Sequence, residues 1–217
     1  MNKLIVRELD QQEYKYILNR MIDFTDNRSA ETADEIWILQ HNSVFTQGKA
    51  GNDSFIMTPG DIPVIRADRG GHVTYHGPGQ ITAYILIDLK RAEMSVFELI
   101  SVIEKKESNT MSKWKVHRYT DRLARGVYCK SRKKIASVGL RVRRGCTYHG
   151  ISFNVDMDMS PWKSINACGL DLEMTQLKNE TNDYVDFNDV LFTFKKELIK
   201  ELGYNDESEN IVDNTSL

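Results

Sequence analysis

A cysteine and a lysine are the two side chains of this sequence whose types best suit covalent chemistry. Cys168 lies between the small residues Ala167 and Gly169, and Lys134 begins an apolar stretch 34 residues earlier. A thiol with the ordinary pKa of about 8.5 is only about 3% thiolate at pH 7, and an ammonium within about 4–6 Å raises that fraction. The pair therefore predicts an activated thiol nucleophile. Taken alone, Cys168 is more typical of a buried structural thiol.

Lys134 opens a predicted strand at 134–142, and strand alternation sorts its residues onto two faces. Apolar surroundings disfavour an ammonium, so we expect the pKa of Lys134 to fall toward the range where an amine exchanges protons near neutrality. The alternative is that Lys134, at the strand end, extends its ammonium into water. One face holds Lys134, Ala136, Val138, Leu140 and Val142, and the other holds Ser137, Gly139, Arg141 and Arg143.

A glycine-rich segment, RGGHVTYHGPGQ at 69–80, is the second place where chemistry is expected. Glycines on both sides of a short strand let the backbone approach another backbone or a ligand closely. Alternation puts Thr74 and His76 on one face and Val73 and Tyr75 on the other. The segment is not a Walker loop, because no G-K-[ST] follows the glycines, and no G-x-G-x-x-G opens a helix here, so a nucleotide phosphate cradle is disfavoured. The alternative is a β-hairpin whose glycines only form turns.

His149 is a third candidate, in phase with Ile151, Phe153 and Val155 on a following strand. A single inward-facing histidine is more often a hydrogen-bonded core residue than a catalyst, and we expect that role for His149.

A basic run at 130–144 contains seven Lys or Arg and no acid, whereas the whole chain has a formal charge of −2. Such a run indicates an acidic partner that docks beside the site. The alternative is an ordinary solvated hairpin. The basic residues are Lys130, Arg132, Lys133, Lys134, Arg141, Arg143 and Arg144.

These candidates must be positioned by a mixed set of strands and helices. Helices are predicted to begin at capping boxes formed by Asp10 with Glu13 and by Ser95 with Glu98, and a third at 188–202 ends at Gly203. Residues 143–145 predict a short hairpin loop. We expect an α/β fold of the α+β type, with a mixed sheet and flanking helices. Strands are predicted at 3–8, 35–40, 63–67, 81–89, 114–118, 126–129, 134–142 and 146–156.

Length and composition fit one domain. The 217 residues are 41% hydrophobic and 28% charged, which is an ordinary globular composition and disfavours a globally basic nucleic-acid binder. Three cysteines, 17 and 22 residues apart, suit neither a disulfide framework nor a zinc site and favour thiols in a reducing compartment. We predict a single domain at 1–204, an acidic disordered tail at 205–217, no membrane span and a cytoplasmic location.

Three segments together resemble one enzyme family. They are the R-G-G-x-x-T-[aromatic]-H-G-P-G-Q block at 69–80, the K-I-x-S-x-G-x-R block at 134–141 followed by H-G at 149–150, and N-x-C-G at 166–169. From about residue 35 to 175 the chain is similar to the lipoyl(octanoyl) transferases, which move an octanoyl group from acyl carrier protein to a lysine of lipoyl domains. Ala167 stands where that family usually has proline, and residues 105–125 follow none of its motifs.

The resemblance implies an α/β fold shared with biotin and lipoate ligases. It implies that Cys168 is the acyl-thioester nucleophile, and that Lys134 lowers the pKa of this thiol and relays protons. It implies no cofactor, no metal and a monomer that acts in lipoate biosynthesis. The implied donor is octanoyl-acyl carrier protein, and the implied acceptors are lipoyl domains of 2-oxoacid dehydrogenase complexes and the glycine cleavage H protein. The implied acyl pocket comprises Arg69, Gly70, Gly71, His72, Val73, Thr74, Tyr75, His76, Ser137, Val138, Gly139, Gly150, Ile151 and Ser152.

Two other functions stay open from the sequence. One is a related ATP-dependent lipoate or biotin ligase, which forms an acyl-adenylate and needs no cysteine. The other is a non-catalytic module that binds nucleic acid or an acidic protein through the basic hairpin. We favour the transferase because matching motifs in three distant segments are hard to obtain by chance. A thioester donor is already activated, so the reaction needs no nucleotide, in keeping with the missing phosphate loop.

Overall fold

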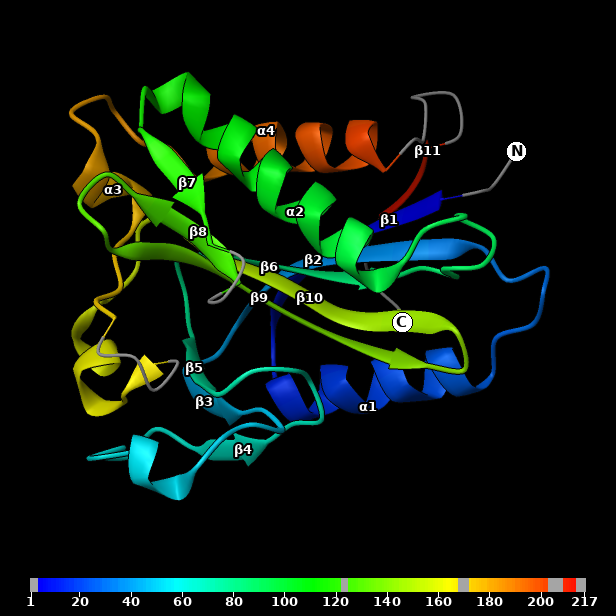
Figure 1. The fold of residues 1–217 in the computed structure, drawn as a ribbon, viewed down its shortest axis with the longest axis horizontal. Helices are drawn as coiled ribbons and strands as arrows, with labels where there is room; N and C mark the ends of the chain where they lie inside the picture. Colours follow the sequence, from blue (N-terminus) through cyan, green and yellow to red (C-terminus); the bar gives the residue numbers. More distant parts are fainter. Residues whose placement is uncertain (1–3, 122–124, 168–171, 203–208, 214–217) are drawn as a thin grey trace.

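The computed structural model describes residues 4–121, 125–167, 172–202 and 209–213. These residues form an eight-stranded sheet in the order β11-β1-β2-β6-β10-β9-β8-β7 (Figure 1). β11, β1 and β2 pair in parallel and the other neighbours are antiparallel, so the predicted mixed sheet is confirmed. The strands are β1 (Leu4–Gln12), β2 (Asp34–His41), β6 (Gln80–Leu86), β7 (Arg118–Thr120), β8 (Gly126–Cys129), β9 (Lys134–Arg143), β10 (Cys146–Asn154) and β11 (Glu209–Asp213).

A smaller sheet lies beside the first and contains β4 (Val64–Arg66), β3 (Val44–Gln47) and β5 (Val73–His76), in that spatial order. Only residues 77–79 separate β5 from β6, yet the two strands belong to different sheets. The segment 69–80 is therefore not a β-hairpin. It carries the chain from the small sheet to the centre of the large one. Gly79 in this connection has φ +83°, and a Cβ there would lie 1.9 Å from the backbone carbonyl oxygen of Asp156.

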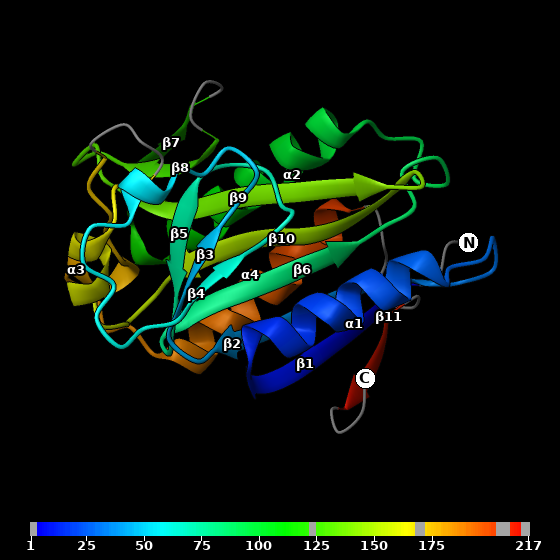
Figure 2. The same cartoon turned by 90° about the horizontal axis from the view of Figure 1, so that it is seen from below.

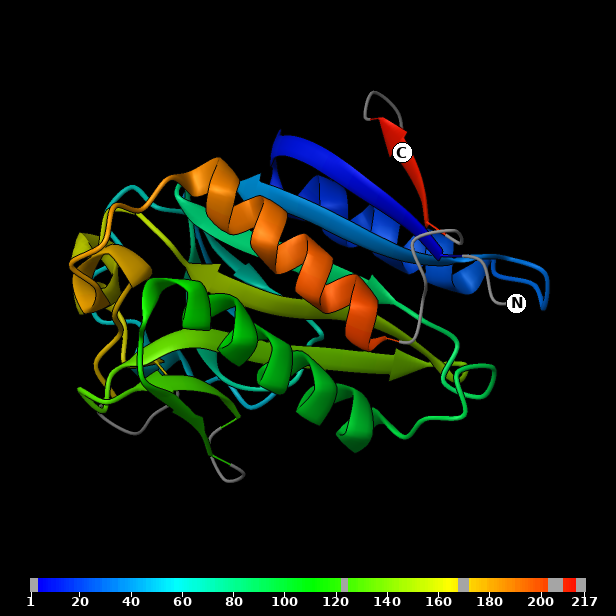
Figure 3. The ribbon, with the colours of Figure 1, turned by 90° about the horizontal axis from the view of Figure 1, so that it is seen from above.

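Helices cover both faces of the large sheet (Figures 1, 2 and 3). α1 (Tyr14–Asp26) lies on the same side as the small sheet, whereas α2 (Val96–Thr110) and α4 (Phe187–Glu201) lie together on the opposite side. Each face has its own cluster of buried apolar side chains, so β2, β6 and β10 are fixed between two cores. Shorter helices are η1 (Asp53–Phe55), η2 (Met111–Trp114), η3 (Ser160–Ser164) and α3 (Leu177–Glu180).

The two predicted capping boxes have opposite outcomes. At α2, the Glu98 carboxylate accepts from the Ser95 N–H at 2.8 Å and the Ser95 hydroxyl accepts from the Glu98 N–H at 3.2 Å, which confirms that box. At α1, the residue that caps the helix is Glu13, and its side chain makes no capping bond. The Asp10–Glu13 prediction is wrong because pairing with β2 continues β1 through Gln12.

The hairpin between β9 and β10 is confirmed. Arg143 pairs with Cys146, so the loop contains Arg144 and Gly145, and both have positive φ, +52° and +80°. Two consecutive positive φ angles match the twist of the flanking strands, which explains the short connection.

The predicted strand at 114–118 is wrong for most of its length. Trp114 ends η2, Lys115 has φ +56°, and β7 begins only at Arg118. Trp114 and Val116 are both buried, which produced the alternating pattern, but the left-handed residue between them turns the chain. The predicted strand at 81–89 likewise ends earlier, at Leu86.

Part of the acidic tail differs from the expected disorder. Glu209–Asp213 forms β11, which pairs in parallel with β1 at the edge of the large sheet. Strand pairing uses backbone groups, so an acidic composition does not prevent it. The predicted helix end at Gly203 lies outside the described residues. No described helix combines the length and apolar composition required to span a membrane.

Candidate active site

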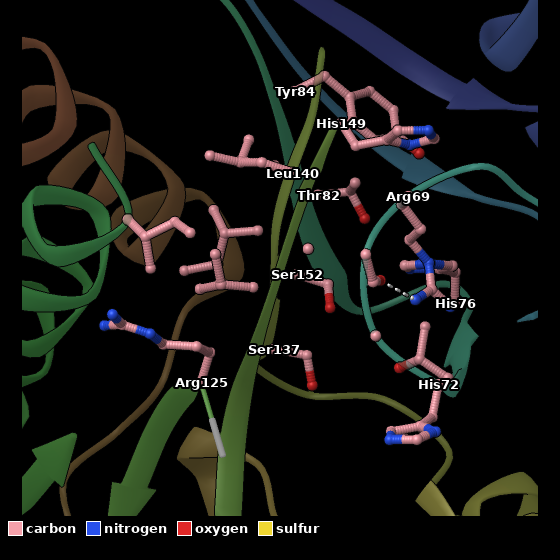
Figure 4. Close-up of a pocket in the computed structure, with 18 of the residues that line it drawn as sticks. Arg69, His72, His76, Thr82, Tyr84, Arg125, Ser137, Leu140, His149 and Ser152 are labelled. Atoms are coloured by element: carbon pink, nitrogen blue, oxygen red, sulfur yellow. Dashed lines mark hydrogen bonds between the residues drawn. The ribbon is translucent and has the colours of Figure 1, made fainter. Parts of the chain in front are cut away.

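A cavity of about 340 Å³ opens between the central strands of the large sheet and the glycine-rich segment (Figure 4). In Figure 4, Arg69, His72 and His76 lie on one side of β9 and β10, whereas Leu140 and Arg125 lie on the other. The cavity thus receives residues from both sides of β9. Its lining comprises Tyr14, Arg69, Gly70, Gly71, His72, Val73, Thr74, His76, Thr82, Tyr84, Ile100, Arg125, Lys134, Ser137, Val138, Gly139, Leu140, His149, Gly150, Ile151 and Ser152.

The floor of the cavity consists of cross-strand rows set by the register of β9, β10 and β6. One row contains three hydroxyl side chains, because Ser137 pairs with Ser152 and Ser152 with Thr82. A neighbouring row contains two glycines, because Gly139 pairs with Gly150. Gly139 and Gly150 carry no side chains, so the floor is open at these two positions, where a chain-like ligand could lie, and Tyr84 completes the row beside Gly150.

The wall of the cavity is the backbone of residues 69–72, held against neighbouring strands. The Gly70 N–H donates to the Leu140 carbonyl at 3.1 Å, and the Gly48 N–H donates to the His72 carbonyl at 3.0 Å. A Cβ on Gly48 would lie 2.4 Å from the Gly71 oxygen. Position 48 therefore requires glycine, because any side chain there would prevent the close approach to the segment 69–72.

Arg69 places a fixed positive charge in this wall. Its side chain is buried and donates to the Thr46 carbonyl at 2.6 Å, to the Thr46 hydroxyl at 2.8 Å and to the Gly70 carbonyl at 2.9 Å. Two of these bonds join the guanidinium to Thr46 of β3, so Arg69 holds the segment 69–72 against the small sheet.

His76 is neutral at physiological pH. Burial, followed by the neighbouring His41 and Arg69, lowers its pKa well below the usual value. Its Nδ1 lies 2.7 Å from the Gln80 side-chain oxygen, so Nδ1 carries the proton and donates. Thr74 and His76 both line the cavity, as expected for residues on one face, and Val73 of the other predicted face lines it as well.

His149 is a hydrogen-bonded buried residue, as expected, and it also lines the cavity. Its Nε2 lies 2.9 Å from Asp68, which also accepts the hydroxyl of Tyr148. Burial raises the pKa of Asp68, but the hydrogen bonds from His149 and Tyr148 outweigh it and lower that pKa to about 2. His149 has φ +60°, a conformation uncommon outside glycine. Asp68, which directly precedes Arg69 in the sequence, thus anchors His149.

His41 supplies a pH-dependent contribution to stability behind the cavity. Its Nδ1 donates to the Gln12 carbonyl at 2.9 Å, so Nε2 accepts from the Tyr84 hydroxyl at 2.6 Å. Burial lowers its pKa from 6.5 to about 4. A histidine whose pKa is lower in the folded than in the unfolded protein contributes its full stability at pH values above the unfolded-state pKa. This contribution is lost as the pH falls from about 6.5 toward 4.

We therefore expect acid to destabilise the protein through His41. Between about pH 7.5 and 5 the free energy of unfolding should fall by about 2 kcal/mol from this residue alone. Urea unfolding at both pH values measures the loss, and His41→Gln should reduce it. The exposed His117→Gln variant is the control and should lose as much stability as the parent protein. Equal losses in the parent and His41→Gln would contradict the assignment.

Lys134 is buried, with only 2% of its surface exposed, so the alternative in which it extends into water is wrong. Its Nζ donates to the Arg125 carbonyl at 2.8 Å and lies 5.6 Å from the centre of the Tyr128 ring. A shift in the β8–β9 register interrupts simple alternation here, and Ile135 and Ala136 both enter the core. Tertiary structure, more than strand phase, therefore decides where Lys134 lies.

Cys168 and Gly169 lie outside the described residues, but the chain on both sides is described. Ala167 is buried in a cluster with Trp162 and Ile165, and it follows the short helix η3, which has Pro161 in its first turn. Met174 packs against the same cluster and forms a bridge with Lys134. The segments before and after 168–171 are thus both tied to the region of Lys134.

The basic run does not form one patch. Lys134 is buried, and Lys133 is paired with Glu173 at 2.7 Å. At the other end of β9, Arg143 binds Asp26 of α1 at 2.6 Å, and Arg144 also donates to Asp26. A strand of ten residues separates the two groups by about 30 Å. The single docking surface expected from the sequence is therefore wrong.

The structure brings the residues of the expected acyl pocket together around the cavity, except Tyr75. That side chain faces the opposite way, packs with Phe45 and bonds Ser43 through its hydroxyl at 2.9 Å. Sequence reasoning missed several lining residues, because most of them come from elements that read as ordinary core and Arg125 lies in a segment without a recognised motif. The missed residues are Tyr14, Thr82, Tyr84, Ile100, Arg125 and Leu140. Among the described residues, no group of three or more His, Cys, Asp or Glu is arranged to hold a metal.

Comparison with known proteins gives the family. Residues 14–199 match the family model described as the lipoyl protein ligase A/B catalytic domain. A relative from Shewanella denitrificans, named octanoyltransferase, is 49% identical over 207 residues, which cover 94% of this chain and 89% of the relative. The chain belongs to the octanoyltransferase family. Octanoyltransferases are acyltransferase enzymes, so family membership disfavours the non-catalytic binding module.

Solved structures show the fold of this chain in more distant proteins. Lipoate-protein ligase A bound with ATP has a TM-score of 0.73 at 11% identity, covering 99% of this chain and 89% of that one. Biotin protein ligase from Aquifex aeolicus, in complex with biotin and ATP, has a TM-score of 0.59 at 14% identity, covering 93% and 71%. The expected fold relationship to both classes of ligase is confirmed.

Proposed function

We propose that this protein moves the octanoyl group from acyl carrier protein to a lysine of lipoyl domains through a thioester on Cys168. The acceptors would be lipoyl domains of 2-oxoacid dehydrogenase complexes and the glycine cleavage H protein. The observation that carries the proposal is the buried Lys134 at the cavity, tied through Met174 to the chain beside Cys168. The cytoplasm is the expected location, because a working thiol needs a reducing compartment.

In the first step, the Cys168 thiolate attacks the carbonyl carbon of the donor thioester. A new C–S bond forms to Cys168, and the bond to the phosphopantetheine sulfur breaks. Lys134 takes the proton of the Cys168 thiol and passes it to the departing sulfur, so no net proton is consumed. One thioester replaces another, which keeps this step nearly balanced in free energy.

In the second step, the acceptor lysine attacks the acyl-enzyme after Lys134 removes a proton from its amine. The amide bond forms as the bond to the Cys168 sulfur breaks, and the proton held on Lys134 returns to that sulfur. An amide is more stable than a thioester, so this step runs downhill and completes the transfer.

The cavity suits an acyl chain. Gly139 and Gly150 leave its floor clear, and the backbone of residues 69–72 covers it. Each methylene buried there contributes roughly 0.8 kcal/mol, so selection for chain length should be graded.

Transfer should proceed without ATP. The donor thioester already carries the free energy needed to form the amide, so purified protein, octanoyl-acyl carrier protein and a lipoyl domain should give octanoylated domain by mass spectrometry. Addition of ATP and Mg²⁺ should not change the rate. Free octanoate should give no product with or without ATP. Product that requires ATP and forms from free octanoate would instead favour a ligase.

A further inference from the structure

Glu104 of α2 is a buried carboxylate that the mechanism above does not use. Only 3% of its surface is exposed. Its Oε2 accepts from the Arg125 guanidinium at 3.0 Å, and its Oε1 accepts from the Gly126 backbone N–H at 2.8 Å. Both oxygens of one buried side chain therefore hold two consecutive residues at the start of β8. Buried charges with this degree of hydrogen bonding fix local geometry strongly.

The peptide unit held by Glu104 is the same unit that binds Lys134. Its N–H belongs to Gly126 and donates to Glu104, whereas its C=O belongs to Arg125 and accepts from the Lys134 ammonium at 2.8 Å. In a trans peptide these two groups point in opposite directions. A hydrogen-bonded chain therefore runs from the carboxylate, through one peptide plane, to the ammonium, and such chains strengthen each bond in turn.

Gly126 lets the lysine approach this peptide. Its φ is +139°, and a Cβ there would lie 2.5 Å from Lys134 Cε and 2.4 Å from the Ala136 oxygen. Any other residue would push the lysine side chain or the strand away. The contact between Lys134 and the peptide thus depends on both the glycine and the carboxylate behind it.

Other groups around Lys134 do not replace Glu104. The Tyr128 ring lies on one side at 5.6 Å. The Arg125 guanidinium is bound to Glu104 itself, and the Glu173 carboxylate is bound to Lys133. Among the described side chains, Glu104 is the one whose carboxylate accepts a hydrogen bond from the peptide that binds the Lys134 ammonium.

We propose that Glu104 is a positioning residue that holds the Lys134 ammonium in the place required for acyl transfer, acting through the peptide between Arg125 and Gly126. This inference rests on the proposed function, because it assumes that Lys134 acts on Cys168. Misplacement of a reacting group by about 1 Å can cost about 100-fold in rate, so a substitution that removes this support should be visible in transfer.

The test is the pH dependence of Cys168 alkylation by iodoacetamide, followed by mass spectrometry of the peptide that contains Cys168. Lys134→Met should move the midpoint of the alkylation profile to higher pH, because the thiolate loses its cation. Glu104→Gln should move it in the same direction, by at least about 0.5 pH unit, and slow transfer about 10- to 100-fold. Loss of a negative charge by itself would move the midpoint to lower pH, so a rise reports the position of Lys134.

Two further variants complete the design. Glu98→Gln removes an exposed carboxylate from the same helix and should leave both the midpoint and the transfer rate unchanged. Glu104→Asp keeps the charge but shortens the side chain, and it should give a smaller rise than Glu104→Gln. It also serves as the test variant if Glu104→Gln does not fold, as judged by thermal unfolding.

The possible failures are distinguishable. An unchanged midpoint in Lys134→Met would overturn the role of Lys134 in the proposed function. A raised midpoint in Lys134→Met with an unchanged or lowered midpoint in folded Glu104→Gln would overturn the positioning role alone. If only Glu104→Asp folds, an unchanged midpoint in that variant has the same meaning.

Discussion

Replacement of Cys168 by serine should abolish octanoyl transfer. A serine hydroxyl is a far weaker nucleophile than a thiolate at neutral pH, and the transfer rate should fall by at least about 10⁴-fold. The measurement is the rate of octanoylation of a lipoyl domain, with octanoyl-acyl carrier protein as donor. Thermal unfolding of the variant should match the parent protein, because thiol and hydroxyl are nearly the same size.

Cys146→Ser is the matched control for this substitution. Cys146 is buried, and burial raises its pKa, so its thiol is poorly suited to act as a nucleophile. It belongs to the hairpin end of β10, at the opposite end of the strand from the residues that line the cavity floor. Its replacement should leave transfer unchanged. Substantial transfer by Cys168→Ser would show that the reaction does not pass through this thiol.

Lys134→Met should lower the transfer rate by about 10²- to 10⁴-fold, the usual contribution of a positioned acid or base. Methionine keeps a long, unbranched side chain in the buried space but has neither a charge nor a proton to exchange. We expect a larger fall near neutral pH than at about pH 9, where more of the Cys168 thiol ionises without help. Initial rates of lipoyl-domain octanoylation over this pH range give the profile.

The adjacent residue provides the control for Lys134→Met. Lys133 carries the same charge one position earlier and pairs with the exposed Glu173 at 2.7 Å. Exposed ion pairs contribute little, so Lys133→Met should retain full transfer. Equal rate losses in the two variants would mean that net charge near the cavity matters, and that Lys134 has no special position.

The sequence predicts the frame of this fold well where local signals are strong. The Ser95–Glu98 box and the Arg144–Gly145 loop place α2 and the β9–β10 hairpin correctly, because each signal is complete within a few residues. The Asp10–Glu13 box fails because long-range pairing of β1 with β2 keeps those residues extended. Tertiary pairing overrides a weak local preference here.

The candidate site is predictable only in part, for a related reason. The glycine-rich segment and the start of β9 carry recognisable patterns, and the structure brings both to one cavity. Tyr14 reads as an ordinary apolar position of α1, and Tyr84 as part of a buried strand. Tyr84 reaches the cavity because the sheet order sets β6 beside β10, and Tyr14 because α1 packs on the same face as Tyr84 and Tyr148. No local pattern reveals either arrangement.

Burial of Lys134 is a further case in which tertiary structure decides. Strand alternation leaves open whether a lysine at the end of a strand faces protein or water. The deciding contacts come from the peptide between Arg125 and Gly126, and from Glu104 on a helix that follows no family motif in its later part. Sequence patterns describe each element alone, whereas this contact requires three elements at once.

The mass of the intact protein after incubation with octanoyl-acyl carrier protein alone shows whether transfer passes through a thioester on Cys168. With no acceptor present, the acyl-enzyme should accumulate. The parent protein should therefore gain the mass of one octanoyl group, located on the peptide with Cys168 and removed by neutral hydroxylamine. An unchanged mass, or an equal gain in Cys168→Ser, would contradict the account.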